Sequence, residues 1–511
     1  MHQPPDNAVL LHDARRRRWL LFRDPVAVLC AATPAEVVPL LHEVADAVDR
    51  RGLYAAGLIS YEAAPAFDPA QRTHPPDDFP PTWFGLYAAP LEVPSPVAGA
   101  APAAAAPAAD WLPSLSAAAY ERALARVHDH IGAGDTYQVN VTLRLRADGL
   151  ADPWGLFGRM VRAQGPGFAG WVSLPEWAIG CASPELFFQQ DGDHIESRPM
   201  KGTAPRGLGS DDDRARARWL RRSSKNRAEN VMIVDMVRND LGRIAIPGSV
   251  QVPRLFDVER YPTVWQMTST VAAATRAPFP EILAALFPAA SITGAPKVRT
   301  MALIADLEDS PRRLYTGTLG YLAPGRQAQF NVAIRTVLTD RRSGRAEYGV
   351  GGGIVWDSKA ASEAAEWATK ARVLRQDSPD FCLLETLLWT PEAGYALLER
   401  HLSRLAASAE YFDRPCPLPA LRDRLAAAAA GWSAAQRVRL LLDASGAVTL
   451  EASALQPLPR PYRLCLARRP VVSTDRFLYH KTTLRQTYQD ALAGRPGFAD
   501  VLLWNDRGEL T

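Results

Sequence analysis

Residues 226–242 read NRAENVMIVDMVRNDLG and lie in a longer stretch, 211–240, that begins with three aspartates. Negative charge near the start of a helix is favoured by the helix dipole, and the pattern predicts helix over much of 211–240. Glu229 stands directly before the apolar run VMIVDMV. It is therefore either a residue at the edge of the core or an acid that points into a cleft.

A second helix is predicted over 358–377, after the strand-like text AEYGVGGGIVWD (346–357). Glu363, Glu366 and Lys370 lie near one face of it, so two acids and a base can share a site. An ordinary exposed Glu366–Lys370 pair would give the same spacing. Three glycines after a strand favour the site, because they let backbone N–H groups approach a carboxylate or phosphate closely.

A third segment, SITGAPK (291–297), resembles an anion site. Small residues precede a helix that begins at Pro296, and the first amides of a helix attract anions. Lys297 would add positive charge. The alternative is a loop that needs its glycine only for a turn.

The composition limits the classes of protein to consider. The 511 residues contain 58 basic and 55 acidic side chains, a balance of +3 that does not favour nucleic-acid binding. We find neither a long apolar span nor a secretion signal, and expect no membrane association and a cytoplasmic protein. Only six basic residues are lysines, which makes each worth examining, because an amine can lose its proton and attack carbon.

We predict three regions. Residues 1–110 form a β-rich N-terminal region that packs on the body and ends in a Pro/Ala-rich linker over about 90–110. Residues 111–377 alternate strands with amphipathic helices and form the catalytic domain. The pattern of the sequence changes near residue 380, and residues 380–511 form a further domain.

Several of these segments occur together in one enzyme family. In order along the chain they are SPELFF (183–188), ESRPMKGTAPRG (196–207), NRAENVMIVDMVRNDLG (226–242), SITGAPKVR (291–299), NVAIRT (331–336), GGGIVWDS (351–358) and EWATKA (366–371). The set resembles the chorismate-utilising enzymes, such as the anthranilate, isochorismate and aminodeoxychorismate synthases. The resemblance implies an α+β fold: a large body of two antiparallel sheets flanked by helices, with a cleft for chorismate and Mg²⁺.

Lys201 indicates which branch of the family the chain is similar to. It precedes Gly202-Thr203, where anthranilate and isochorismate synthases typically carry a small residue. Lysine there resembles component I of aminodeoxychorismate synthase. The implied mechanism has the Lys201 amine attack C2 of chorismate while the C4 hydroxyl departs, and ammonia then adds at C4 and expels the lysine. Glu185 matches the general acid that protonates the departing hydroxyl.

The resemblance also implies a metal site and a substrate site. Glu229 and Glu366 match magnesium ligands, and Glu363 is a candidate to support them. The substrate-binding candidates are Thr293, Gly294, Tyr321, Arg335, Gly351, Gly352 and Lys370. Gln138 occupies the position of the water-activating lysine of isochorismate synthases, which disfavours water as the nucleophile. Gln266 stands where many relatives have histidine, so any proton transfer at that position is in doubt.

The last 130 residues resemble the beginning of a second enzyme class. LLETLLW (383–389), RHLSRLAASAEYF (400–412) and HKTTLRQTYQDA (480–491) are similar to the fold-type IV pyridoxal-phosphate (PLP) enzymes, in particular aminodeoxychorismate lyase, and Lys481 falls on the lysine that binds PLP. The text stops at Glu509-Leu510-Thr511, before the acid that pairs with the cofactor nitrogen in relatives. We expect a partial domain that is inactive or a fragment of a bifunctional enzyme.

The expected function is amination of chorismate at C4 to 4-amino-4-deoxychorismate, on the route to 4-aminobenzoate and folate. We find no cysteine nucleophile in a glycine-flanked elbow, so the ammonia is expected to come from a separate glutaminase subunit. Three alternatives stay open: an anthranilate synthase component I, a PLP-dependent lyase with the front half as scaffold, and a noncatalytic regulator.

Overall fold

The computed structural model describes residues 2–96, 109–375, 379–456 and 460–511. The predicted linker at about 90–110 therefore lies largely outside the described residues, but its first part is strand β6 (Leu91–Val93), paired with β2 (Arg18–Phe22). The chain divides into two compact units. Unit 1 comprises residues 1–203 and 220–378, and unit 2 comprises residues 204–219 and 379–511.

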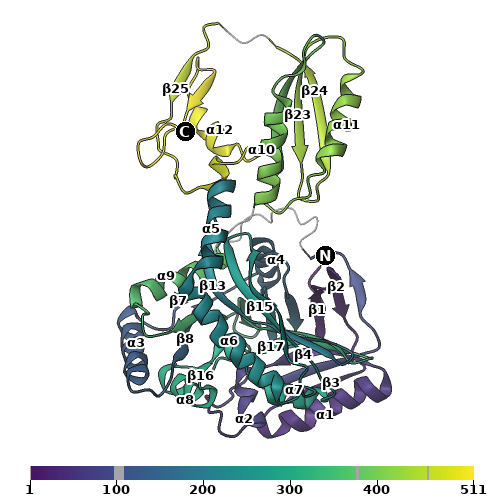
Figure 1. Cartoon of the computed structure of the whole chain (residues 1–511), viewed down its shortest axis with the longest axis vertical. Coiled ribbons are helices and arrows are strands. Elements are labelled where there is room, and N and C mark those ends of the chain that lie inside the picture. Colours follow the sequence, from purple (N-terminus) through teal and green to yellow (C-terminus); the bar gives the residue numbers. More distant parts are fainter. Residues whose placement is uncertain (1, 97–108, 376–378, 457–459) are drawn as a thin grey trace. The chain divides into compact units, whose positions relative to one another are not determined.

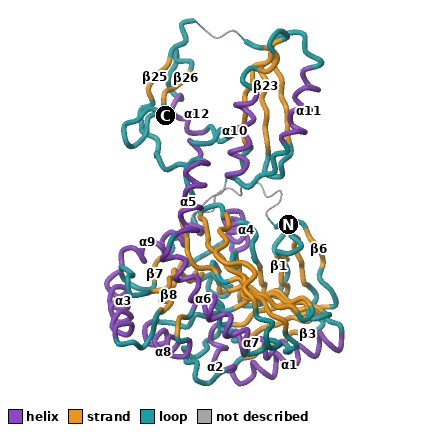
Figure 2. Tube along the Cα trace, viewed as in Figure 1, coloured by secondary structure: helices purple, strands orange, loops and turns teal. Residues whose placement is uncertain are grey.

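Unit 1 contains two ten-stranded antiparallel sheets (Figures 1 and 2). The first runs β16 (Gly294–Ala295), β8 (Gln138–Ala147), β20 (Ala346–Ile354), β19 (Thr336–Asp340), β10 (Trp177–Cys181), β9 (Gly170–Ser173), β1 (Ala8–Asp13), β2, β6, with β7 (Leu112–Pro113) beside β8. The second runs β13 (Met200–Pro205), β15 (Val264–Ala274), β12 (His194–Arg198), β11 (Leu186–Asp191), β18 (Gln327–Val332), β17 (Thr318–Ala323), β4 (Tyr54–Ile59), β5 (Thr82–Tyr87), β3 (Ala27–Ala31), with β14 (Gln251–Arg260) beside β15.

The N-terminal region is part of both sheets. Strand β1 pairs with β9, and β4 pairs with β17, so backbone hydrogen bonds join residues 8–93 to the body. We predicted a region that packs on the body. The same residues extend the two sheets, because open strand edges are filled by pairing.

Helices cover the outer faces of the sheets, as apolar stripes require. α1 (Pro34–Arg51), α6 (Ser224–Gly242) and α7 (Phe279–Leu286) pack on the second sheet. α3 (Ala117–Gly132), α4 (Pro153–Gln164) and α8 (Lys297–Leu307) pack on the first, and α9 (Ala360–Ala371) contacts β20. A separate apolar cluster, including Val9, Leu58 and Leu319, fills the space between the sheets. The short helix α2 (Ala64–Phe67) completes unit 1.

The helix predicted over 211–240 is two helices, α5 (Ser210–Arg222) and α6. The break falls at Ser223, whose hydroxyl accepts a hydrogen bond from the Asn226 backbone N–H and so caps α6. Ser223 begins a new helix because its side chain replaces the missing backbone partner of the first turn.

Unit 2 is built on a four-stranded sheet, β22 (Gly394–Tyr395), β21 (Leu383–Thr390), β23 (Gln436–Leu442) and β24 (Val448–Ala454). α10 (Leu398–Tyr411) and α11 (Leu418–Ala429) bury their apolar faces against it. The remaining elements are the strands β25 (Leu464–Leu466) and β26 (Asp500–Leu502), the helix α12 (Gln486–Leu492) and the 3-10 helix η4 (Arg476–Leu478). No helix among the described residues is long and apolar enough to cross a bilayer.

Candidate active site

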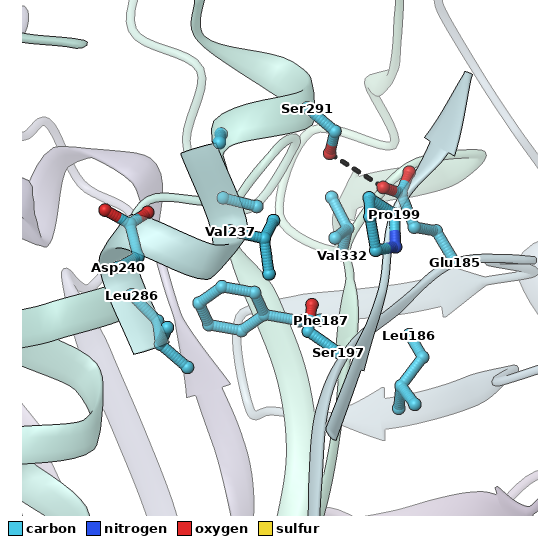
Figure 3. Close-up of a pocket in the computed structure, with 12 residues that line it drawn as sticks. Glu185, Leu186, Phe187, Ser197, Pro199, Val237, Asp240, Leu286, Ser291 and Val332 are labelled. Carbon is cyan, nitrogen blue, oxygen red and sulfur yellow. Dashed lines mark hydrogen bonds between the residues drawn. The ribbon is translucent and has the colours of Figure 1, made fainter. Parts of the chain in front are cut away.

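Glu185 precedes strand β11 and is 4% exposed. The Ser291 hydroxyl donates a hydrogen bond to its Oε1 at 2.7 Å, and the Met200 backbone N–H donates to the same atom at 3.4 Å. Figure 3 shows this carboxyl beside a small pocket that is otherwise mostly apolar, with Phe187, Val237 and Leu286 in its lining. Burial raises the pKa of Glu185 to about 7, so this acid can carry a proton at neutral pH.

Lys201 lies on β13, at the end of the second sheet, and is partly buried. Its backbone carbonyl accepts a hydrogen bond from Asn230 Nδ2 on α6. Its amine reaches β20 of the first sheet, because a Cβ atom on Gly353 would lie 2.9 Å from Lys201 Nζ. Burial, together with the charge of Lys370, lowers the pKa of Lys201. Both effects favour the neutral amine that a nucleophile needs.

The three acids predicted to bind metal are Glu229 on α6 and Glu363 and Glu366 on α9. A Cβ on Gly352 would lie 3.1 Å from Glu363 Oε2 and 3.7 Å from Glu366 Oε1, both on α9. Burial raises the pKa of Glu229 on α6, and the negative charge of Glu366 adds to this increase. The three carboxylates supply oxygen ligands, as Mg²⁺ prefers, and Mg²⁺ needs only one or two from the protein. They fit such an ion, although no group of three or more potential ligands is drawn together among the described residues.

Lys370 forms the ordinary ion pair with Glu366 and also lies beside the glycine run, so both interpretations of its helix apply to it. Its Nζ is 2.8 Å from Glu366 Oε1, the predicted i,i+4 pair, and it donates a hydrogen bond to the Gly351 carbonyl at 2.7 Å. Burial alone would raise the pKa of Glu366, but the Lys370 ammonium outweighs it and lowers that pKa. Lys370 therefore keeps one acid of the site ionised.

Arg335, Thr293 and Gly294 lie at the ends of strands. Arg335 stands between β18 and β19 with φ of 52°, and its side chain donates to Gln164 Oε1. The Thr293 carbonyl accepts a hydrogen bond from the Asn140 backbone N–H. Gly294 has φ of 143° and pairs with Val139, where any Cβ would meet the Gln138 carbonyl at 2.0 Å. Close strand contact explains this glycine.

Tyr321 does not join these residues. It belongs to the cluster between the sheets, where its ring centroid is 5.8 Å from that of Phe22. Residues on a strand alternate between faces, and Tyr321 lies on the inner face of β17. That Tyr321 binds substrate stays a prediction. Tyr315, which sequence reasoning missed, instead packs against Gly349 of β20, two residues before the glycine run.

Two expectations are corrected. Lys297 is not free to bind an anion, because its Nζ is 3.0 Å from Asp240 Oδ2. The glycines 351–353 do not follow a strand but lie inside β20, paired with β8. Their contribution is the absence of side chains, which leaves room for Lys201 and the acids of α9.

Gln138 and Gln266, the two positions that differ between branches of the family, lie near Lys201 or its strand. Gln266 on β15 accepts a hydrogen bond from Thr203 Oγ1, two residues after the lysine, at 2.9 Å. A Cβ on Gly353 would lie 2.5 Å from Gln138 Nε2. Neither position carries a histidine or lysine.

Residues 6–376 match the family model described as chorismate binding enzyme. The chain belongs to the chorismate-binding enzyme family. Residues 383–511 match the model of amino-transferase class IV.

This chorismate-binding enzyme is 42% identical over 260 residues to aminodeoxychorismate synthase component 1 of Salmonella typhimurium, covering 50% of this chain and 56% of the relative. It is 38% identical over 269 residues to anthranilate synthase component 1 of Streptomyces coelicolor, covering 52% of each chain. The chain thus spans just over half the length of these curated relatives. The solved anthranilate synthase component I of Streptococcus pneumoniae matches with a TM-score of 0.60 at 22% identity, covering 74% of this chain and 94% of that one. This likeness confirms the predicted two-sheet α+β fold.

The class IV segment of the enzyme holds Lys481 against the sheet of unit 2. The Lys481 carbonyl accepts a hydrogen bond from the Leu384 backbone N–H at 2.9 Å, and Thr482 pairs with Leu383. Burial lowers the pKa of Lys481, and nearby Arg404 adds to that decrease. Arg404 also holds the buried Glu385 through two hydrogen bonds.

Proposed function

We propose that this chain is an aminodeoxychorismate synthase component 1, which adds ammonia at C4 of chorismate to give 4-amino-4-deoxychorismate for 4-aminobenzoate and folate synthesis. The observation that carries the proposal is the Lys201 amine, partly buried with a lowered pKa in the space above Gly353. A lowered pKa increases the fraction of the neutral amine, which is the form that acts as a nucleophile.

The chemistry divides one difficult substitution into two steps. Neutral Lys201 forms a C–N bond at C2, the ring double bonds shift, and the C4–O bond breaks. Glu185 gives its proton to the departing hydroxyl, which leaves as water. Ammonia then forms a C–N bond at C4, the double bonds shift back, and the C2–N bond to Lys201 breaks. Glu185 suits this role because burial raises its pKa to about 7.

Glu229 and Glu366, supported by Glu363, would hold Mg²⁺, which supplies positive charge for the ring carboxylate of chorismate. Arg335, Thr293, Gly294, Gly351, Gly352 and Lys370 are proposed to bind the substrate. Arginine suits a planar carboxylate because its guanidinium can donate two parallel hydrogen bonds. We expect Glu366→Gln to raise the Mg²⁺ concentration needed for half-maximal rate.

The remaining parts of the proposal follow from the component 1 assignment. Ammonia would come from a separate glutaminase subunit, with free ammonium as a substitute, and the protein would act in the cytoplasm. Residues 111–377 would carry the catalytic residues, and 380–511 would form the lyase-like domain.

Product analysis tests the proposal. Chorismate, Mg²⁺ and ammonium are incubated with wild type, Lys201→Ala and the exposed-lysine control Lys359→Ala, and the products are separated by mass spectrometry. We expect wild type and the control to form aminodeoxychorismate, which retains the enolpyruvyl group, and Lys201→Ala to lose most of this activity. Anthranilate as product would instead favour the anthranilate synthase alternative. Full activity in Lys201→Ala would exclude the covalent route.

A second candidate function rests on unit 2. Lys481, with its lowered pKa, could hold PLP, and Arg404 and Arg437 supply positive charge nearby. The cofactor would act as an electron sink for a lyase reaction. Added PLP should give a new absorbance band that disappears in Lys481→Ala. No band in wild type would argue against this candidate.

A further inference from the structure

Gln138 is a buried amide with an unused donor. It is the first residue of β8, is 1% exposed, and its backbone pairs with Ala295 of β16. Its Nε2 has no hydrogen-bond partner among the described residues. Buried polar groups are almost always paired, because an unpaired donor loses its bonds to water without replacement. The Gln138 amide therefore has a donor available for a further hydrogen bond.

The amine of Lys201 lies beside the same glycine as the Gln138 amide. A Cβ on Gly353 would lie 2.5 Å from Gln138 Nε2 and 2.9 Å from Lys201 Nζ. The two nitrogen atoms thus share the space that this glycine leaves open, although they come from different sheets. An ammonium group has only donors and cannot accept from an amide N–H, whereas a neutral amine has a lone pair that can.

We propose that Gln138 is a positioning residue for Lys201, whose neutral amine accepts a hydrogen bond from the Gln138 side-chain amide. This inference rests on the proposed role of Lys201 as nucleophile. The bond would hold the amine in the cleft until chorismate displaces it from the lone pair. The charged groups around Lys201 are Glu185, Glu229, Glu366 and Lys370, and of these the three acids favour the ammonium form. The Gln138 amide would favour the neutral amine of Lys201 instead, and it does so without adding a charge.

Two substitutions of similar length separate this role from others. Gln138→Met removes the donor, and we expect kcat to fall about tenfold while KM for chorismate stays within twofold. Gln138→Glu offers a carboxylate that stabilises the ammonium, and its rate should rise only at a higher pH than that of wild type. Gln71→Met, at another buried glutamine, is the matched control. Melting temperatures of all variants check that they fold.

A second measurement does not depend on amination. Lys201 is labelled with acetic anhydride in the full chain without chorismate, across a pH series, and the modified peptide is quantified by mass spectrometry. We expect the labelling midpoint of Gln138→Glu to lie at higher pH than that of wild type. A kcat for Gln138→Met within twofold of wild type would overturn the inference. So would a loss confined to KM with unchanged labelling, since Gln138 would then contact chorismate. If Lys201→Ala still aminates, the proposed function fails separately, and labelling still reports the contact.

Discussion

Replacing Glu185 by glutamine should stabilise the protein while it removes the proposed general acid. The folded-state pKa of about 7 is higher than the ordinary value of 4.5 because the carboxyl is buried. Below pH 4.5 the group is protonated in both states and costs nothing. Between pH 4.5 and pH 7 the folded state keeps a proton that the unfolded state has released, so stability falls with rising pH. Above pH 7 the carboxyl is charged in both states, and the cost of burying that charge stays constant.

The size of the effect follows from this difference. Each pKa unit corresponds to about 1.4 kcal/mol, so the full cost above pH 7 is roughly 3 kcal/mol. Between pH 5 and pH 8 the stability of Glu185→Gln relative to wild type should therefore grow by about 2.5 kcal/mol. Contacts of the new amide with Ser291 add an offset, but this offset does not change with pH.

Denaturant unfolding of both proteins at pH 5, 6, 7 and 8, followed by a signal from unit 1, measures this gap. Glu121→Gln on the exposed face of α3 is the control, because a solvated carboxyl has similar surroundings in both states. The reasoning is refuted if the gap between Glu185→Gln and wild type is the same at every pH. If Glu185→Gln loses amination but its stability difference from wild type does not change with pH, Glu185 acts in catalysis and burial does not raise its pKa.

Three further predictions concern the neighbours of these residues. Ser291→Ala removes a hydrogen bond to the charged form of Glu185, so the alkaline fall in kcat should move up by roughly one to two pH units in a rate profile. Gly353→Ala should fold normally but lose amination, since its Cβ meets only the flexible ends of Gln138 and Lys201. Gly351→Ala should lower the melting temperature, because its Cβ meets the Val141 carbonyl at 2.3 Å; equal melting temperatures would contradict this contrast. Arg206→Ala removes the buried Arg206–Asp213 ion pair and should destabilise unit 2 by about 3–5 kcal/mol, whereas the exposed Arg218→Ala should not, as urea unfolding can show.

The sequence predicts the acids and the lysine of the site better than it predicts their surroundings. The pattern of residues 211–240 predicts a helix that contains Glu229, and the spacing of Glu363, Glu366 and Lys370 predicts that they share a second one; the structure has them on α6 and α9. The 3.6-residue period is a local property, so a short window is enough to detect it. The resemblance to the chorismate-utilising enzymes added Lys201 and Glu185, which no local period marks.

The errors arise where long-range contacts decide the outcome. The residues around Lys297 do not indicate that its ion-pair partner is Asp240, which lies 57 residues away in the sequence. Tyr321 lies on β17, and the pairing of that strand with β4 and β18 determines that its ring joins the cluster between the sheets. The glycine run could have been assigned to a strand interior, since glycine there often marks a close approach of other groups.

The glycine run explains how residues from separate elements can meet at one place. The Gly351 carbonyl accepts from Lys370, Gly352 faces the acids of α9, and Gly353 leaves room for Lys201 and Gln138. A strand of ordinary residues would fill this space with side chains and keep the amine on the second sheet apart from the helix on the first. Because β20 keeps its backbone pairing with β8, the strand stays in place although it contributes no side chains there. Gly352 and Gly353 thus leave the space in which these side chains meet, and a methyl group on Gly353 would be enough to displace the amine on which the proposed chemistry depends.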